Sequence, residues 1–252
     1  MTKELIPWQT LSEAYAFLGN SLLAPMSQTS AVGLDPAFWR AFPDFDDAGV
    51  SDAISGCVRY AEGAVARAEE GGNIVQDASV EYTKLFIGPP SPSAAPWETM
   101  YRSDTNIGFG EATFQMKALL KAAGLEVKNE NHQYEDHMGI ELLYLSELCR
   151  RRAAQEADAA DDAETEPGVR IDATGEPTGS AEAAEPTDSV AKVSSIDPAS
   201  DASVFTFIET HPLSWVDAFR ARIAEEFPEG YFVGLAGLIA AILRFHVRSI
   251  AR

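Results

Sequence analysis

The segment from residue 153 to residue 203 limits the possible folds of this 252-residue chain more than any other stretch. Its 51 residues contain 13 acidic side chains, 2 basic side chains and no aromatic ring. Such a polar and charged stretch cannot bury enough apolar surface to offset the entropy that ordering removes. We therefore expect a disordered acidic linker at 153–203, so that a folded core has to come from residues 1–152 and 204–252.

The chain as a whole is also acidic. It has 39 acidic and 19 basic residues and a formal net charge of −20. The linker contributes −11 of this charge, which leaves −9 on the other 201 residues. Excess negative charge outside the linker argues against binding to nucleic acids or anionic membranes and favours cationic partners.

Helical periodicity dominates both flanking blocks. Apolar side chains recur three and four residues apart, and no stretch shows the sustained alternation of a strand. We expect an all-α fold in which an N-terminal block, 1–152, and a C-terminal block, 204–252, complete one helical bundle. The expected helices cover residues 12–23, a short turn of helix within 33–49, and residues 51–70, 77–87, 111–123, 136–152 and 231–248. Order is expected to return at residue 204, and Pro212 suits the first turn of a further helix that ends near residue 227.

Several features predict a cytoplasmic location. Cys57 and Cys149 are isolated thiols, which supports neither a disulfide framework nor a zinc site. The N-terminal stretch contains Glu4 and Glu13 and lacks the apolar run of a secretory signal. The longest apolar run, 231–243, has 13 residues, whereas a bilayer needs about 20.

The stretch Glu81–Tyr101, EYTKLFIGPPSPSAAPWETMY, is the most informative part of the N-terminal block. Proline lacks an amide donor and disfavours helical backbone before it, so the helix should end near residue 87. Trp97 and Tyr101 follow the break. They form either the wall of a binding site or anchors that hold the loop to the core. The helix before the break carries Tyr82, Leu85 and Phe86 at helical spacing, and the break begins at Gly88 and Pro89.

The next helix begins with a second group of polar residues. Asp136 can cap this helix or bind a basic group, and His137 and Glu141 lie four residues apart on one helical face. The pair could be half of a metal site, or His137 could simply hold the loop by a hydrogen bond. A metal site needs three or four ligands, and His211 and His246 are solitary in the sequence, so we expect no metal.

The sequence offers no support for nucleotide or serine chemistry. It contains none of the patterns G-x-x-x-x-G-K-[ST], G-x-G-x-x-G or G-x-S-x-G. We therefore expect a protein that is not an enzyme and that needs no cofactor.

Three motifs in order resemble one family. They are E-Y-x-x-L-F-x-G-P with A-P-W-E-x-x-Y in 81–101, E-D-H-M-G-I-E-L-x-Y-L in 135–145, and F-x-x-x-H-P-L-x-W-x-x-x-F in 207–219. Together they resemble the TorD/DmsD family of redox-enzyme maturation chaperones, also called Tat proofreading chaperones. The resemblance implies an all-helical cytoplasmic protein. It would bind the twin-arginine signal peptide, and often the body, of a molybdopterin oxidoreductase subunit before cofactor insertion and Tat export.

The resemblance also implies where the peptide binds. Apolar burial would supply affinity for the apolar part of the signal, and carboxylates would select its arginines. The chain departs from the family in having Gln133-Tyr134 where Glu-Pro is common and in its long acidic insertion. Two other functions remain open: a metal-dependent enzyme using His137 and Glu141, and a scaffold that recognises only a folded partner. A monomer and a domain-swapped dimer are both compatible with the linker. The implied peptide-binding residues are Tyr82, Leu85, Phe86, Gly88, Pro89, Trp97, Tyr101, Asp136, His137 and Glu141.

Overall fold

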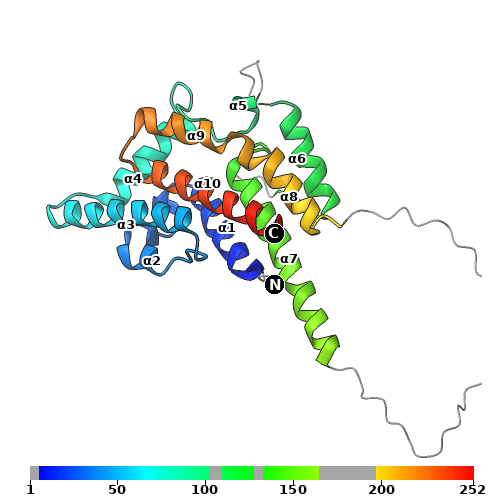
Figure 1. The fold of residues 1–252 in the computed structure, drawn as a ribbon. Helices are drawn as coiled ribbons and strands as arrows, with labels where there is room; N and C mark the ends of the chain where they lie inside the picture. Colours follow the sequence, from blue (N-terminus) through cyan, green and yellow to red (C-terminus); the bar gives the residue numbers. More distant parts are fainter. Residues whose placement is uncertain (1–5, 103–108, 128–132, 165–196) are drawn as a thin grey trace, which may run out of the picture.

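The structure is a computed structural model that describes residues 6–102, 109–127, 133–164 and 197–252. Within these ranges the chain is helical and contains no strand, which confirms the all-α expectation (Figure 1). The helices are α1 (Trp8–Leu23), α2 (Pro36–Arg40), α3 (Ala48–Glu69), α4 (Ile74–Tyr82), α5 (Thr99–Arg102), α6 (Glu111–Ala122), α7 (Met138–Glu164), α8 (Asp201–Thr210), α9 (Pro212–Glu226) and α10 (Tyr231–Ile250). Short 3₁₀ turns span Met26–Gln28 and Val32–Leu34, and a π-helical turn spans Thr83–Ile87.

The core is built around two helix pairings. Helix α1 packs along α7, and α10 lies between α3 and α9 (Figure 1). Where α1 crosses α7, a Cβ atom added to Gly19 would lie 2.8 Å from the carbonyl oxygen of Gly139, and the reverse distance is also 2.8 Å. Both glycines are therefore needed for the two backbones to approach so closely.

Helix α10 is the central helix of the bundle. Ten of its residues are buried, as expected for a helix that is apolar nearly all round. It is 20 residues long and apolar enough to cross a membrane by length and composition, although half of the qualifying window is buried inside the protein. Burial against other helices accounts for this composition without a bilayer.

A buried carboxylate from the N-terminal block caps α10. Glu81 Oε2 accepts a hydrogen bond from Tyr231 N at 3.0 Å, and Oε1 accepts one from Phe232 N at 2.9 Å. The first amides of a helix have no partner within it, so this carboxylate satisfies two of them. A Cβ atom at Gly230 would lie 2.4 Å from Glu81 Oε1, so glycine leaves room for the cap.

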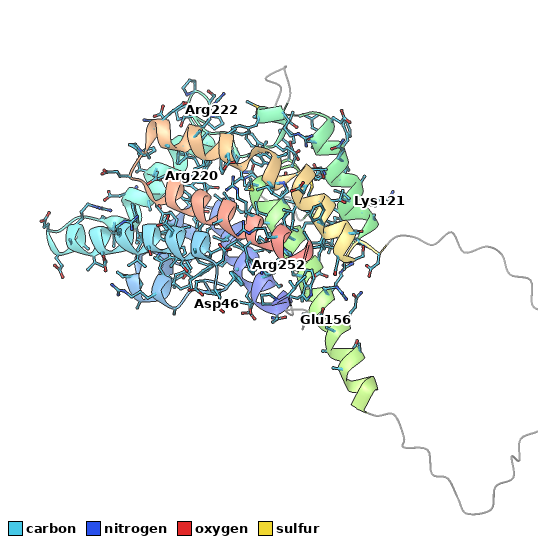
Figure 2. All side chains as sticks on the ribbon, in the orientation of Figure 1. Asp46, Lys121, Glu156, Arg220, Arg222 and Arg252 are labelled. Atoms are coloured by element: carbon cyan, nitrogen blue, oxygen red, sulfur yellow. The ribbon has the colours of Figure 1, made fainter. Side chains whose placement is uncertain are left out.

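The helices extend into both ends of the expected acidic linker. Helix α7 continues to Glu164, twelve residues beyond the expected boundary, because alanine and glutamate are good helix formers. Ser200 caps α8, and Ala199 before it is fully buried. The expected boundaries at 152 and 204 were therefore wrong, and the middle of the expected linker, 165–196, lies outside the described residues. Helix α7 leaves the bundle near Glu156 (Figure 2).

Other helix ends follow local signals to different degrees. Gly124 has φ +70 just after α6, and Pro212 opens α9, both as expected. The helix expected from residue 12 begins at Trp8 instead. Ser12 does not cap it, because its hydroxyl is buried and donates to the carbonyl of Ser146 at 2.8 Å.

Candidate functional site

The first two motifs meet in the structure. Residues 96–98 run antiparallel to residues 136–138, with Glu98 N donating to Asp136 O at 2.9 Å and Met138 N donating to Pro96 O at 2.9 Å. The proline-containing loop is thereby held against the start of α7. This is the juxtaposition that a groove built from both motifs requires.

The apolar and aromatic residues before the loop belong to the core. Tyr82, Leu85 and Phe86 are only 2%, 0% and 4% exposed. The Tyr82 hydroxyl donates to Leu22 O at 3.2 Å, and the Phe86 ring stacks on Phe219 with centroids 5.8 Å apart. These three side chains support the loop from beneath and offer no surface to a ligand.

The turn out of this helix depends on glycine. Gly88 N donates to Thr83 O at 2.8 Å, which closes the π-helical turn, and Gly88 has φ +93. A Cβ atom at this position would lie 2.7 Å from the carbonyl carbon of Ser91, so a side chain would clash. Pro89 follows and is exposed. Of the expected site residues in this turn, only Pro89 reaches solvent.

Asp136 is fully buried and forms hydrogen bonds within the protein. Its Oδ2 accepts from the amide of Thr99 at 3.0 Å and from the Thr99 hydroxyl at 2.6 Å, and its Oδ1 accepts from the Thr113 hydroxyl at 3.0 Å. The carboxylate thus ties α5 and α6 to the residues before α7. Asp136 does not cap α7, and its burial gives it a supporting position behind the surface.

His137 is also fully buried. Its Nδ1 accepts a hydrogen bond from Gly139 N at 2.9 Å, so Nε2 carries the proton of the neutral ring. Burial lowers the pKa of His137 to about 3. Nε2 finds no acceptor among the described residues, and the ring lies 6.4 Å from that of Trp97. His137 therefore caps α7 through its side chain and fixes the loop.

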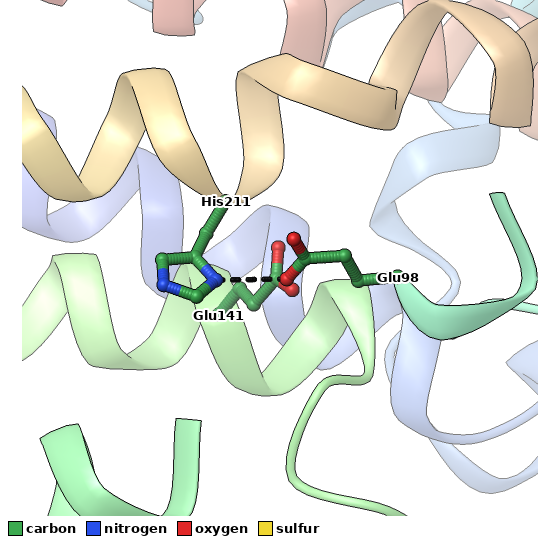
Figure 3. Close-up of side chains that lie close together, drawn as sticks. All are labelled: Glu98, Glu141 and His211. Atoms are coloured by element: carbon green, nitrogen blue, oxygen red, sulfur yellow. Dashed lines mark hydrogen bonds and ion pairs between the residues drawn. The ribbon is translucent and has the colours of Figure 1, made fainter. Parts of the chain in front are cut away.

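Glu141 does not pair with His137. It lies instead beside Glu98 and His211, in a cluster that brings together the loop, α7 and the junction of α8 and α9 (Figure 3). His211 Nδ1 donates to Glu98 Oε2 at 2.8 Å, and Trp215 Nε1 donates to Glu141 Oε2 at 3.2 Å. The expectation that His211 is solitary was wrong, because its partners are distant in the sequence.

The two carboxyl groups of this cluster have different protonation. Burial raises the pKa of Glu141 well above its usual value, and the charge of Glu98 raises it further. Burial opposes ionisation of Glu98 as well, but its hydrogen bonds and charge interactions with His211 and Arg102 lower its pKa overall. A protonated Glu141 can donate to the Glu98 carboxylate, and this bond satisfies Glu141 Oε1, which otherwise has no partner among the described residues.

The same cluster is the place where a metal could bind. One ligand atom each from Glu98, Glu141 and His211 lies within 4.8 Å of the others. However, Arg102 already forms an ion pair with Glu98, and a neutral Glu141 is a weak ligand. The proton on Glu141 and the guanidinium of Arg102 already balance the charge of the two carboxyl groups. We therefore interpret Glu98, Glu141 and His211 as a structural contact between the two helical blocks and call this cluster the clasp.

Tyr101 and Trp215 extend this clasp. The two rings stack with centroids 5.1 Å apart, and Trp215 is 1% exposed. Arg222 lies over the outer face of Tyr101 at 5.9 Å. Tyr101 therefore fixes α5 to α9, as the anchoring interpretation of the loop expected.

An aromatic patch lies at the surface beside the loop. We define it as Trp97, Phe109, Phe114 and Tyr134. The rings of Phe109 and Phe114 are 4.9 Å apart, those of Phe109 and Tyr134 5.6 Å, and those of Trp97 and Tyr134 5.9 Å. Phe109, Phe114 and Tyr134 are 45%, 59% and 40% exposed. No sequence motif singled out these three residues, and only their exposure in the folded chain identifies them.

A mostly apolar groove between α6 and α7 lies next to this patch along the chain. Its volume is about 440 Å³, within the usual range of ligand sites. Gln133 lines the groove and directly precedes Tyr134 of the aromatic patch. We call this feature the α6–α7 groove. It is lined by Leu23, Leu120, Leu125, Glu126, Val127, Gln133, Ile140, Leu143, Tyr144 and Glu147.

Comparisons with known proteins find similarity to one protein family and to several chaperones. The model of the nitrate reductase delta subunit family matches residues 46–169. A chaperone protein TorD of Vibrio cholerae is 25% identical over 140 residues, which is 55% of this chain and 61% of the relative. A Tat proofreading chaperone DmsD of Salmonella typhi is 25% identical over 77 residues, 31% of this chain and 38% of the relative.

The chain therefore resembles the TorD/DmsD chaperones over about half of its length. A second Vibrio cholerae TorD chaperone is 33% identical over 78 residues, which is 29% of this chain and 35% of the relative. The chain spans about three fifths of the TorD relative that it matches over 140 residues, and less of the other two. The matched part includes the proline-containing loop, α6 and all of α7, so it contains the aromatic patch and every residue of the α6–α7 groove except Leu23.

Proposed function

We propose that this protein is a cytoplasmic chaperone that binds the twin-arginine signal peptide of a molybdopterin oxidoreductase subunit and assists the maturation of that subunit before Tat export. Its similarity to relatives that are named as chaperones supports this role. The observation that carries the proposal is the α6–α7 groove, a largely apolar site on a protein of net charge −20, whose lining residue Gln133 directly precedes the exposed Tyr134 of the aromatic patch.

The chemistry of this surface suits such a peptide. A twin-arginine signal has a basic head followed by an apolar segment. The apolar segment would lie in the groove and against the aromatic patch, where burial contributes about 25 cal/mol per Å². Glu126 lines the groove and is exposed, and Glu135 follows Tyr134 directly. These carboxylates would bind the arginines by charge-assisted hydrogen bonds.

This proposal revises the site that the family resemblance implied. Trp97 stays in the binding surface, because it is half-buried and contacts Tyr134. The buried residues of the original set act by holding the loop and α7 in place. Leu85→Ala would therefore weaken peptide binding mainly by destabilising the fold, since a buried leucine truncated to alanine costs about 2–5 kcal/mol.

Calorimetry of the whole chain against synthetic twin-arginine signal peptides of molybdopterin oxidoreductases tests the proposal. We expect one peptide to bind with a Kd in the micromolar range or below and its Arg-Arg→Ala-Ala version to bind much more weakly. Phe114→Ala and Leu125→Ala should each weaken binding about tenfold, because each removes apolar contact area equivalent to roughly 1–2 kcal/mol. Val80→Ala is the matched control, since Val80 is 54% exposed on α4, outside the proposed surface.

The remaining outcomes separate the alternatives. Binding of the oxidoreductase subunit without binding of any signal peptide would overturn the peptide site and indicate a scaffold for a folded partner. Peptide binding that Phe114→Ala and Leu125→Ala leave intact would place the peptide elsewhere. Stoichiometric metal in the purified protein, removed by Glu98→Gln, would favour a metal-dependent function of the clasp.

A further inference from the structure

A second groove lies on another face of the molecule, between α3 and α10. Its volume is about 350 Å³. The wall that α10 contributes consists mainly of the small residues Gly234, Gly237, Ala240 and Ala241, with Val233 as the only larger apolar side chain of the lining. Arg220 reaches this groove from α9, which passes beside α10 (Figures 1 and 2). We call it the α3–α10 groove.

The charge of this groove is opposite to that of the chain. Four arginines line it, Arg59 from α3, Arg220 from α9, and Arg244 and Arg248 from α10. Only two acidic residues, Asp47 and Asp52, are part of the lining. A chain with 39 acidic and 19 basic residues thus gathers four guanidinium groups around one concave site.

Among the described residues, two of these arginines form weak ion pairs and the other two form none. Arg244 pairs with Asp217 and Arg248 pairs with Asp47, and in both pairs the arginine side chain is more than two fifths exposed. Exposed ion pairs contribute about 0–1 kcal/mol, so either arginine can turn to a ligand at little cost. Within the described part of the chain, Arg59 and Arg220 form no ion pair.

A glycine inside α10 makes room for one of the unpaired arginines. A Cβ atom at Gly237 would lie 3.2 Å from Nε of Arg220 and 3.6 Å from its Cζ. Glycine in the interior of a helix costs about 1 kcal/mol relative to alanine. Arg220 therefore lies directly against the α10 backbone, in a position that a larger residue at 237 would obstruct.

We propose that the α3–α10 groove binds a small phosphate anion, such as orthophosphate or pyrophosphate. Guanidinium groups from three helices can surround a tetrahedral oxyanion and donate paired hydrogen bonds to it. The volume lies at the lower end of the range for small-molecule sites. The nearly complete lack of large apolar side chains disfavours a peptide, which would need apolar contacts to anchor it. This site is independent of the proposed peptide site on α6 and α7.

Titration calorimetry of the whole chain with pyrophosphate and with orthophosphate, at constant ionic strength set by chloride, tests the proposal. We expect saturable binding at one site per chain, with pyrophosphate the tighter ligand because it carries more charge. Arg220→Gln and Arg59→Gln should each weaken pyrophosphate binding at least tenfold. Gly237→Leu should weaken it as well by displacing Arg220.

Arg222→Gln is the matched control. It removes the same charge from the same helix, but Arg222 lies over Tyr101 and does not line the groove. The Kd of Arg222→Gln for pyrophosphate should stay within twofold of that of the unmodified protein. Circular dichroism should show equal helix content in all variants. Absence of binding by both anions overturns the proposal. An equal loss of pyrophosphate affinity in Arg222→Gln and Arg220→Gln also overturns it, because it would indicate general charge attraction. Binding of an acidic peptide without binding of either phosphate would assign the groove to a different ligand and contradict the proposal.

Discussion

Two of the four histidines are buried as neutral rings. His137 and His246 are both fully buried, and burial lowers the pKa of each to about 3. His137 Nδ1 accepts from Gly139 N, and His246 Nδ1 lies 3.1 Å from the hydroxyl of Tyr15. Since an unfolded chain protonates histidine near pH 6.5, both residues link the stability of the fold to pH.

We expect acid to destabilise the protein through these two rings. Their folded pKa values are depressed, so their contribution is fully present above about pH 6.5 and is lost as the pH falls toward 3. Between pH 7 and pH 5 each histidine should lower the free energy of unfolding by ~2 kcal/mol. Urea unfolding at the two pH values measures this change.

The variant His137→Asn isolates one of the two contributions. Asparagine can still accept from Gly139 N but does not titrate, so the variant should lose about half of the histidine effect. Glu141 acts in the opposite direction, because its raised pKa gives stability that is present at low pH and lost as the pH rises. Glu141 is present in both proteins, so its contribution to the pH dependence cancels when the variant is compared with the unmodified protein. An unchanged pH dependence in His137→Asn would show that this ring is not the titrating group.

At the scale of elements, the start of α10 depends on a residue about 150 positions earlier. Gly230 has no side chain to cap the helix, and Glu81 supplies two acceptors across the bundle. Burial raises the pKa of Glu81, while its two backbone hydrogen bonds lower it. The first motif of the sequence thus stabilises the central helix rather than a ligand.

We expect Glu81→Gln to lower the free energy of unfolding by about 1–3 kcal/mol. The amide nitrogen of glutamine cannot accept, so one buried amide of α10 loses its partner. Gly230→Ala should also destabilise, since its Cβ would lie 2.4 Å from Glu81 Oε1. Glu69→Gln, at the exposed end of α3, is the control. Thermal unfolding gives the comparison, and equal melting temperatures for Glu81→Gln and Glu69→Gln would refute the capping role.

For the whole molecule, the contacts between α7 and α8 define how the two blocks join. Arg152 Nε donates to Asp201 Oδ1 at 2.9 Å, and Gln155 Nε2 donates to Asp197 Oδ2 at 3.0 Å. The chain therefore returns beside residues 152–155 of α7, whereas α7 continues to Glu164. At 1.5 Å per residue, the nine residues from 155 to 164 span about 14 Å. A connection much shorter than residues 165–196 would cover this distance.

We expect a variant in which eight glycine and serine residues replace 165–196 to fold as a monomer. Eight extended residues reach about 26–29 Å, well over the gap. The replacement removes 6 acidic and 2 basic residues and changes the net charge from −20 to −16. Light scattering and thermal unfolding should show a monomer with nearly unchanged stability. Joining Glu164 directly to Asp197 should instead produce a domain-swapped dimer, since no residue then bridges the gap. Dimerisation or unfolding of the eight-residue variant would contradict this account.

Prediction from sequence succeeded where the signal is local. Gly124 and Pro212 mark helix ends through their own backbone preferences, and the helical spacing of apolar residues identified an all-α bundle with α10 at its centre. The proline-containing loop does meet the start of α7, as the motifs suggested. Asp136 and Leu85 are fully buried, which the motifs did not indicate, because a motif does not distinguish an exposed residue from one that supports the surface.

The sequence by itself determined which segments form helices, since capping, proline and helical periodicity act over a few residues. It also determined the acidity of the chain. Tertiary structure decided which polar groups meet and which rings stay in solvent. Glu98, Glu141 and His211 come from three distant segments, and packing of these segments selects their protonation and their partners. Exposure of Phe114 and the convergence of four arginines beside Gly237 likewise arise only when the helices pack together, because burial and charge proximity are properties of the assembled bundle.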